Sequence, residues 1–280
     1  MDVAILPYKA TSKSFRRLAV SLGLRGIKLE GSKYKNKEGR LIINWGQSNP
    51  QEWYEGKGEI LNSIESVKLA TNKLDSFVRM KERGVNIPAF YESREDVVKI
   101  MDENPKARFI GRTLLCSTKG KGCYLISKRE EDLDFAESPL AKHYKIFTQY
   151  IPKTAEYRVH VFKGKVFDIA QKRARKSGSG VLEVSGLDYK IRSYERGWVF
   201  CRENVKIPEG LEEGAVKAVE SLDLDFGAVD MIWNRTLGIF VLEVNTAPAL
   251  EGGTLVGYTS QFRSFIKGRE DSPEEEAANA

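Results

Sequence analysis

The chain is poor in the residues that build zinc and redox centres. It contains two histidines, His143 and His160, and three cysteines, none of them in a Cys-x-x-Cys pair. Two histidines are too few for a histidine-built zinc site. An odd number of cysteines without a close pair indicates reduced thiols rather than a disulfide framework. We therefore expect Cys116, Cys123 and Cys201 to be packing residues of a cytoplasmic protein.

Long apolar runs are also missing. No run approaches the roughly 20 residues that a membrane-spanning helix needs. Residues 1–6 lead into Pro7 and charged residues, not into the apolar core of a signal peptide. We expect a soluble intracellular protein that does not engage membranes.

The overall composition is that of a globular protein. Of the 280 residues, 41% are hydrophobic and 30% are charged, which is typical of a soluble protein with a substantial core. The net charge of +6 favours anionic ligands, but it does not distinguish nucleotides from acidic peptides or nucleic acid.

The most informative stretch, residues 225–250, has the pattern of a β-hairpin. Its arms, residues 226–233 and 239–244, are rich in β-branched and aromatic residues, and Gly238 lies in the connection. Two such arms around a short glycine-containing turn predict an antiparallel pair of strands.

Three oxygen-bearing side chains fall on one face of this hairpin. Pairing of Asn234 with Ile239 would put Asp230 directly opposite Glu243. Asn245, two residues beyond Glu243, shares that face because side chains alternate along a strand. Such oxygen ligands suit a hard cation such as Mg²⁺. The alternative is that the carboxylates are solvated at a sheet edge, but carboxylates within apolar runs are costly unless their charge is offset.

The other patterns alternate between strands and helices, which indicates an α/β protein. The expected strands are residues 3–6, 41–45, 108–116, 123–126, 146–151, 157–162 and 166–170, and the expected helices are 14–22, 62–84, 92–103 and 214–222. Residues 172–176 read as a basic run leading into a loop.

The segment Ser117-Thr118-Lys119-Gly120-Lys121-Gly122 has the composition of a loop that covers phosphates, although a flexible turn has the same composition. The separated cations Lys73, Arg112, Arg158, Lys172 and Arg173 are candidate phosphate ligands, and each alone also fits a solvated surface. Together with the metal ligands they match what a bound nucleoside triphosphate requires. No residue stands out as a nucleophile or general base, so catalysis would rest on positioning and electrostatics.

These segments resemble the ATP-grasp carboxylate–amine ligases. They are most similar to the α-L-glutamate ligases that add glutamate to the C-terminus of a ribosomal protein. Leu61-Asn62-Ser63, Asn72-Lys73-Leu74 and Gly84-Val85-Asn86-Ile87-Pro88 match the family's helix with its first ATP-binding lysine. Glu156-Tyr157-Arg158-Val159 and Gln171-Lys172-Arg173-Ala174 resemble its D-x-R strand and basic segment. Glu243-Val244-Asn245-Thr246-Ala247-Pro248-Ala249-Leu250-Glu251-Gly252 resembles its E-V-N-x-x-P-x-L-E-G signature, with Asp230 upstream.

The resemblance covers about residues 61–258 and implies a fold and a domain order. The fold is ATP-grasp, an α/β (α+β) architecture in which two α/β subdomains sandwich ATP. We predict a small N-terminal α/β domain (residues 1–65), a subdomain with a glycine-rich lid loop (66–147), a subdomain with the magnesium site (148–267) and a disordered acidic tail (268–280).

The resemblance also implies how ATP is bound. Its phosphates would be held by Lys73 and Arg112 beneath a lid that includes Ser117, Thr118, Lys119, Gly120 and Gly122. Lys172 is a further candidate for ATP binding. The backbone of Gln149, Tyr150 and Ile151 would meet the adenine.

The implied reaction phosphorylates a carboxylate to an acyl phosphate, which an amine attacks to form an amide. Arg158 would contact the transferred phosphate, and Arg173 would stabilise the tetrahedral intermediate. Asp230, Glu243 and Asn245 would bind two Mg²⁺ ions, for which Mn²⁺ can substitute.

Three residues depart from the family pattern. Arg112 stands where lysine is usual, which keeps the charge but replaces a point donor with a fork. Gln149 stands where glutamate is usual, and Glu156 replaces an aspartate. None of these changes touches the predicted metal ligands, so we expect an active enzyme.

The leading interpretation is an amide-forming ligase that joins glutamate or another amino acid to a peptide or protein end. One alternative is a kinase that acts on a small molecule and stops at phosphoryl transfer. Another is a basic nucleic-acid-binding module, although the sequence has no RNP, KH or zinc signature. The oligomeric state is open, since related ligases are often dimers or tetramers.

Overall fold

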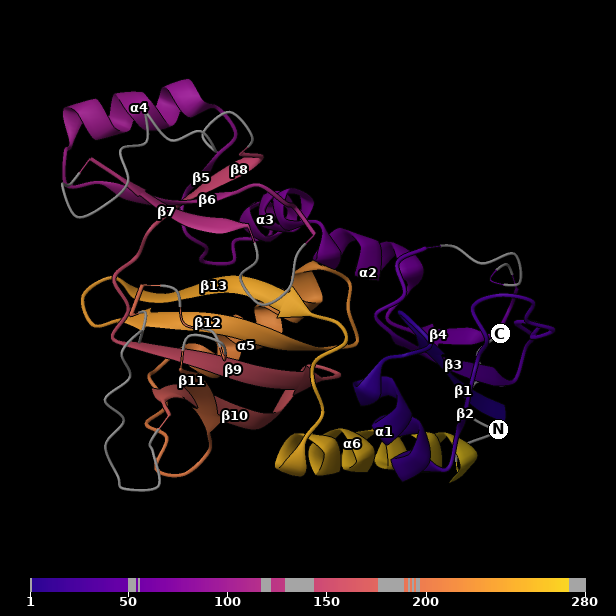
Figure 1. The fold of residues 1–280 in the computed structure, drawn as a ribbon. Helices are drawn as coiled ribbons and strands as arrows, with labels where there is room; N and C mark the ends of the chain where they lie inside the picture. Colours follow the sequence, from indigo (N-terminus) through magenta and orange to yellow (C-terminus); the bar gives the residue numbers. More distant parts are fainter. Residues whose placement is uncertain are drawn as a thin grey trace.

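The computed structural model describes residues 2–49, 54, 56–116, 122–128, 144–175, 189, 190, 192, 194 and 197–271. Within these ranges the strands form three sheets, joined and covered by helices (Figure 1). We call them the N-terminal sheet, the small sheet and the large sheet, in the order in which they begin along the chain. This is the α/β (α+β) architecture predicted from the sequence.

The N-terminal sheet is parallel and four-stranded. In spatial order its strands are β2 (Arg25–Gly26), β1 (Asp2–Pro7), β3 (Arg40–Trp45) and β4 (Glu59–Leu61). Helix α1 (Lys13–Leu22) begins at Ser12, whose hydroxyl accepts the amide N–H of Phe15 at 3.3 Å. A serine in this position satisfies one of the amides that a helix start leaves without a partner.

Two short helices stand where one long helix was predicted. Helix α2 (Ile64–Thr71) ends at Asn72, and helix α3 (Lys73–Glu82) begins there. The backbone of Asn72 is extended, and its side-chain oxygen accepts the amide N–H of Leu74 at 3.1 Å. Asn72 therefore caps a new helix instead of continuing the old one, which sets the direction of Lys73.

The small sheet is antiparallel and pairs with one helix. Its strands are β5 (Phe90–Tyr91), β8 (Ile146–Gln149), β6 (Arg108–Arg112) and β7 (Cys123–Ser127). Helix α4 (Arg94–Glu103) packs on it through Val97 and Met101, which meet Phe109 and Phe147 in a buried cluster. Strand β6 ends at Arg112, four residues earlier than predicted.

The large sheet is antiparallel and lies in the centre of the molecule (Figure 1). Its strands are β11 (Trp198–Cys201), β10 (Lys165–Ala174), β9 (Ala155–Phe162), β12 (Phe226–Asn234) and β13 (Gly238–Asn245). Tyr157, Val159 and Val161 point to one face, where helix α5 (Leu211–Ser221) packs on them. Side chains alternate along a strand, so the intervening residues of β9 point to the opposite face, which we call the site face.

Both hairpins of the large sheet contain a β-bulge. In β9–β10, Val166 pairs with Val161 but Asp168 pairs with His160, which leaves Phe167 as an extra residue. A one-residue shift moves every later side chain to the other face. The bulge therefore turns Asp168 toward the site face.

The pairing at the β12–β13 turn differs from the prediction by one residue, and the bulge in this hairpin offsets the difference. The expected pair of Asn234 with Ile239 is wrong, because Asn234 pairs with the preceding residue. Leu242 is the extra residue of this bulge and shifts the register by one. Asp230 therefore lies opposite Glu243, as predicted.

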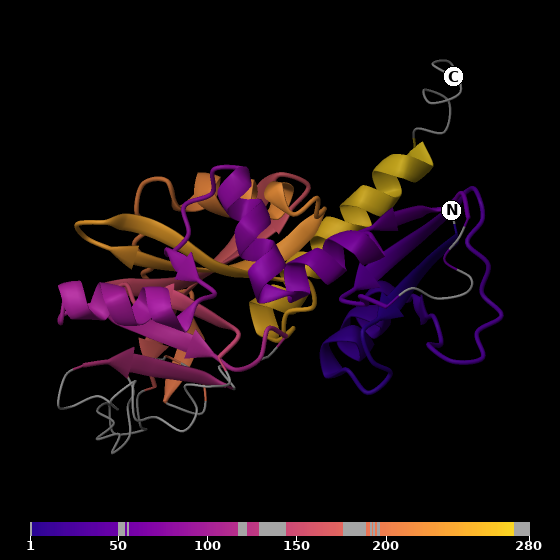
Figure 2. The same ribbon diagram turned by 90° about the horizontal axis from the view of Figure 1, so that it is seen from above.

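Helix α6 (Gly252–Asp271) joins the two ends of the molecule. It lies beside α1 and reaches from the large sheet to the N-terminal sheet (Figures 1 and 2). The buried aromatic rings at this junction are Trp45, Phe162, Phe226, Tyr258 and Phe262. Residues 268–271 are helical, so the disordered tail predicted from residue 268 does not begin there; residues 272–280 lie outside the described part of the chain.

No helix in the described part of the chain has both the length and the apolar character that crossing a membrane requires.

Candidate functional site

The polar side chains of the site face form rows that run across the strands. The first row contains Asn245, Ala228, His160 and Asp168, and the second contains Glu243, Asp230, Arg158 and Ala170. The third contains Ile232 and Glu156, with Lys172 bonded to Glu156. The rows place residues from four strands next to one another, although they are far apart in sequence.

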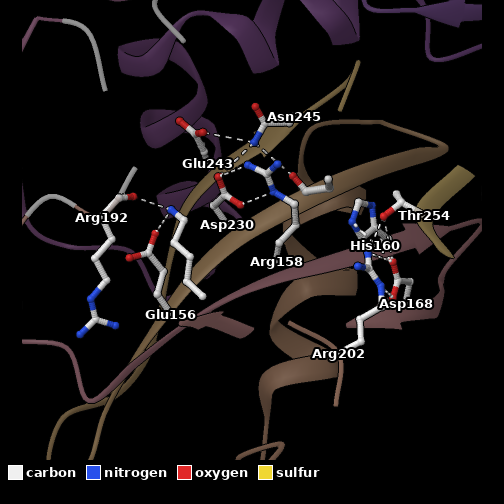
Figure 3. Close-up of polar contacts among 12 residues, drawn as sticks. Glu156, Arg158, His160, Asp168, Arg192, Arg202, Asp230, Glu243, Asn245 and Thr254 are labelled. Atoms are coloured by element: carbon white, nitrogen blue, oxygen red, sulfur yellow. Dashed lines mark hydrogen bonds and ion pairs between the residues drawn. The ribbon is translucent and has the colours of Figure 1, made fainter. Parts of the chain in front are cut away.

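Asp230, Glu243 and Asn245 converge as the sequence predicts (Figure 3). The Asn245 amide nitrogen lies 3.4 Å from Asp230 Oδ2 and 3.2 Å from Glu243 Oε1. Asp230 and Glu243 are direct cross-strand partners. Two carboxylates and one amide therefore lie together on the sheet. As candidate metal ligands, these three residues are called the metal-ligand group below.

Two cations offset the charge of these carboxylates. Arg158 donates from Nε and NH2 to the two oxygens of Asp230, both at 2.7 Å. Lys73 donates to Glu243 Oε2 at 2.8 Å and to the carbonyl oxygen of the bulge residue Leu242 at 3.2 Å. Helix α3 thus reaches the large sheet through Lys73.

Burial and the neighbouring charges shift the pKa values in this group. Burial raises the pKa of Asp230, and Arg158 only partly opposes it. Burial would also raise the pKa of Glu243, but the cations Lys73 and Arg112 outweigh it and hold that pKa well below its usual range. Burial lowers the pKa of Lys73. Both carboxylates are held in place by a charged partner.

The donor set fits a magnesium ion. Among the described residues no three His, Cys, Asp or Glu side chains gather in one place, so a soft-metal or zinc site is not formed there. The two carboxylates offer oxygen donors, and rotation of the Asn245 side-chain amide by 180° would turn its oxygen toward them. Mg²⁺ binds hard oxygen donors of this kind together with phosphate oxygens.

An open cleft of about 150 Å³ lies between the small sheet and the site face. Arg112 and Thr148 line it from the small sheet, and Asp230 and Glu243 line it from the large sheet. The charged residues in its wall are the cations Arg112, Lys153, Lys172, Lys190 and Arg192 and the carboxylates Glu156, Asp230 and Glu243. The cleft therefore carries an excess of positive charge, which suits an anionic ligand.

Two arginines in this wall have buried donors that are left over. The Nε atoms of Arg112 and Arg192 are buried, and neither finds a partner in the described part of the chain. A buried donor without a partner is costly, and phosphate oxygens are strong acceptors for guanidinium groups. The leftover donors thus fit a phosphate-bearing ligand.

Glu156 is the centre of a buried charge network beside the metal-ligand group. Lys172 donates to its Oε1, Lys153 lies 3.2 Å from its Oε2, and Lys172 also donates to the carbonyl oxygen of Arg192 at 2.8 Å. Burial would raise the pKa of Glu156, but Lys172 and Lys153 outweigh it and lower that pKa. Two lysines are thereby fixed in the cleft by one carboxylate.

The predicted hinge residues line the same cleft. Gln149, Tyr150 and Ile151 are all in its wall. The amides of Gln149 and Tyr150 already donate to the carbonyl oxygens of Ala89 and Arg108, at 2.7 and 2.8 Å. Of these three residues, Ile151 is therefore the one whose backbone N–H is left to donate to a ligand.

The predicted lid loop is only partly described. Gly122 has a positive φ of 69° and accepts the amide N–H of Thr113 at 3.0 Å, which closes the base of the loop between β6 and β7. Ser117, Thr118, Lys119 and Gly120 lie outside the described residues.

Arg173 is not brought to the site. Lys172 and Arg173 belong to strand β10, not to a run beyond its end as predicted, so their side chains point to opposite faces. Arg173 donates to Gln171 Oε1 at 2.9 Å and to the carbonyl oxygen of Asn204 at 2.7 Å. The register of β10 puts it on the α5 side of the sheet, away from Arg158. Its predicted contact with a reaction intermediate on the site face is therefore not supported.

Lys153, Lys190 and Arg192 line the cleft but were not singled out from the sequence. Lys153 lies just beyond the predicted hinge, and that position was an available clue. Lys190 and Arg192 come from a segment with no strand or helix pattern, so only the folded chain brings them to the cleft.

The fold was compared with known proteins. No protein-family model matches the sequence, and no curated protein does so either. Solved structures do match. The VanG D-Ala:D-Ser ligase from Enterococcus faecalis superposes with a TM-score of 0.65 at 13% identity, over 95% of this chain and 98% of that one. The ATP-grasp ligase PsnB, complexed with a minimal precursor, superposes with a TM-score of 0.64 at 11% identity, over 90% and 92%. The D-alanine–D-alanine ligase from Bacillus anthracis gives 0.59 at 13% identity, over 94% and 92%. The chain therefore has the ATP-grasp fold.

Proposed function

We propose that this protein is an ATP-dependent ligase that forms an amide bond between a carboxylate and an amine. In the first step the carboxylate oxygen attacks the γ-phosphorus of ATP, which gives an acyl phosphate and releases ADP. In the second step the amine attacks the acyl carbon, phosphate leaves, and the amine loses one proton. Asp230, Glu243 and Asn245, gathered in a cation-lined cleft, are the observation that carries this proposal.

The residues of the cleft have distinct roles in this proposal. Asp230, Glu243 and Asn245 would hold two Mg²⁺ ions, which neutralise phosphate charge when bound. Lys73, Arg112 and Lys172 would bind the phosphates of ATP, and the leftover Nε of Arg112 supports this. Arg158, on the same face and bonded to Asp230, would contact the transferred phosphate.

The substrates are proposed from the fold and its neighbours. PsnB and the macrocyclase MdnC from Microcystis aeruginosa were each solved with a precursor peptide, and the D-cycloserine synthetase DcsG shares the fold. These likenesses support an amino acid or peptide as a substrate. Addition of glutamate to a peptide or protein end, which the sequence signature suggests, is the finer form of the proposal.

The domain division and location are proposed as well. The chain would consist of residues 1–65, 66–147 and 148–267, with ATP between the second and third parts and an acidic tail after helix α6. None of the three cysteines, all in the described part of the chain, forms a disulfide, which supports a cytoplasmic enzyme.

The test is phosphate release from Mg·ATP across a panel of amino acids and acidic peptides. For Glu243→Ala we expect release to fall by at least about 100-fold, as when one preorganised charge-stabilising group is lost. Glu212→Ala, a change at an exposed glutamate of α5, is the matched control and should retain full activity. Hydroxylamine should trap the acyl phosphate as a hydroxamate, whereas a kinase would give none. Release that Glu243→Ala leaves unchanged would contradict the metal assignment.

A further inference from the structure

A second polar cluster lies on the site face, beside the metal-ligand group. It contains Asp168 at the end of the first row, with His160, Arg202 and Thr254 around it (Figure 3). Asp168 is two residues along β10 from Ala170, the partner of Arg158. The two rows are therefore roughly 7 Å apart, a distance that a small substrate can bridge.

Arg202 is held in one orientation. Its Nε donates to Asp168 Oδ1 at 2.8 Å, and its NH2 donates to Asp168 Oδ2 at 2.7 Å. NH2 also donates to the hydroxyl of Thr254, a buried residue in the first turn of α6. A fork held at two oxygens and a hydroxyl loses little freedom when it binds a ligand.

Part of the Arg202 guanidinium remains available. Arginine has five N–H donors, and Nε and NH2 account for three of them. No described residue accepts from the two N–H groups of NH1, and the side chain is 37% exposed. A planar donor pair of this kind is suited to a carboxylate.

Among the described residues, Arg202 is the one arginine or lysine that forms an ion pair with Asp168. Burial lowers the pKa of His160 to about 3, against the opposing effect of Asp168, so the imidazole is neutral. Its Nε2 lies 3.9 Å from Asp168 Oδ2, too far for a hydrogen bond. Within the described part of the chain, Oδ1 of Asp168 accepts one bond, from Arg202, and a carboxylate oxygen has room for another donor.

The pair is poorly explained by stability alone. A partly exposed ion pair contributes only about 0–1 kcal/mol to folding. Helix α6 is already anchored by Tyr258 and Phe262, both fully buried among aromatic rings. A cation and an anion, each with unused capacity and next to the row that contains Arg158, form a charge-balanced site for a zwitterion.

We propose that Arg202 and Asp168 bind the amine substrate, and that this substrate is a free α-amino acid. Its carboxylate binds NH1 of Arg202, and its amino group faces Asp168 and points toward Arg158. This inference rests on the proposed ligase function and names the class of one of its two substrates. Arg202 is then a specificity-determining residue.

The test measures binding, so it does not depend on turnover. The whole protein, loaded with Mg²⁺ and a non-hydrolysable ATP analogue, is titrated calorimetrically with each common α-amino acid. The amino acid that binds best is then compared with the matching amine without a carboxylate and the matching acid without an amine. We expect both truncated compounds to bind at least tenfold more weakly.

Variants locate the site. Arg202→Gln should weaken amino-acid binding at least tenfold while the affinity for the ATP analogue stays within twofold. Asp168→Asn should remove the preference for the amino acid over the acid without an amine. Arg17→Gln is the matched control, because Arg17 is also part-exposed and donates to the carbonyl oxygen of Leu250, just before α6, at 2.8 Å. Its binding should stay within twofold of wild type, and thermal unfolding checks that each variant is folded.

The outcomes separate the two proposals. Equal binding of the amine without a carboxylate, unchanged binding in Arg202→Gln, or no amino-acid binding to a protein that does bind the ATP analogue would overturn the inference and leave the ligase proposal standing. Failure to bind the ATP analogue with Mg²⁺ would instead contradict the ligase proposal itself.

Discussion

The two hairpins of the large sheet use the same irregularity for different purposes. Each contains one β-bulge, and each bulge turns acidic residues onto the site face. In β12–β13 the carbonyl of the extra residue, Leu242, accepts a hydrogen bond from Lys73 on α3. In β9–β10 the ring of the extra residue, Phe167, packs edge-on against Tyr258 of α6, with ring centroids 4.9 Å apart.

The difference shows how the site is assembled from distant parts of the chain. The β12–β13 bulge contacts helix α3 and brings Lys73, a candidate phosphate ligand, to the metal-ligand group. The β9–β10 bulge docks the last helix, and Thr254 of that helix contacts the Asp168–Arg202 pair. One bulge serves the ATP side of the site face, and the other serves the side that we assign to the amine substrate.

The largest expected effect comes from the Glu156 network, which joins the two strands of the β9–β10 hairpin through Glu156 and Lys172. Glu156→Gln leaves Lys172 and Lys153 buried without their carboxylate, so at pH 7 we expect a loss of about 3–5 kcal/mol in the free energy of unfolding. Glu212→Gln, at an exposed position, should change it by no more than about 0.5 kcal/mol.

The same network predicts a pH dependence. Because the pKa of Glu156 is lowered in the folded protein, its stabilisation is present above the unfolded pKa of about 4.3 and is lost as the pH falls through the folded pKa. Denaturant unfolding across pH 3–7 should therefore show a shallower acid slope for Glu156→Gln than for wild type. Equal slopes would mean that Lys172 and Lys153 do not hold the carboxylate ionised.

The docking of α6 on the β9–β10 bulge can be tested within one helix. A Cβ at Gly257 would lie 2.9 Å from the Phe167 ring, so Gly257→Ala should destabilise the protein by about 1–3 kcal/mol. A Cβ at Gly268 would meet nothing within 4 Å, so Gly268→Ala should stabilise it by up to about 1 kcal/mol. Thermal unfolding of both variants checks the prediction, and equal shifts would show that α6 does not pack on the bulge as described.

The smallest expected effect concerns Lys73 and the β12–β13 bulge. Lys73 forms an ion pair with Glu243 and so competes with a metal ion for this carboxylate. Lys73→Met should therefore let the nucleotide-free protein bind Mn²⁺ at least about tenfold more tightly, a gain of about 1.4 kcal/mol in binding free energy. Electron paramagnetic resonance of free Mn²⁺ measures this directly. Lys163→Met, which removes the partner of Asp225 instead, should leave it unchanged. Weaker Mn²⁺ binding in Lys73→Met would mean that the lysine supports the metal site.

Local patterns placed the metal-ligand group only in part. The alternation of side chains along one strand is enough to put Glu243 and Asn245 on one face, but the position of Asp230 opposite Glu243 also depends on the bulge. The predicted partner of Asn234 was nevertheless off by one residue. Nothing in the local sequence marks the bulge at Leu242, because it depends on how β13 meets both its partner strand and Lys73.

Short-range patterns could not place residues whose neighbours are distant in sequence. Lys172 and Arg173 looked equivalent as two cations in one basic run, yet the strand that contains them sends one into the cleft and the other to the α5 side. Asn72 was read as part of a continuous helix, but its side chain caps a new one.

The sequence by itself determined the ATP-grasp fold class and pointed to Asp230, Glu243 and Asn245 as candidate ligands, because strand periodicity and a short, contiguous signature are local properties. Only the tertiary structure decided which cations accompany them and how the Asp168–Arg202 pair forms beside the row that contains Arg158. Those contacts join residues 34 to 170 positions apart, and such pairings depend on sheet register and helix docking, which no short segment encodes.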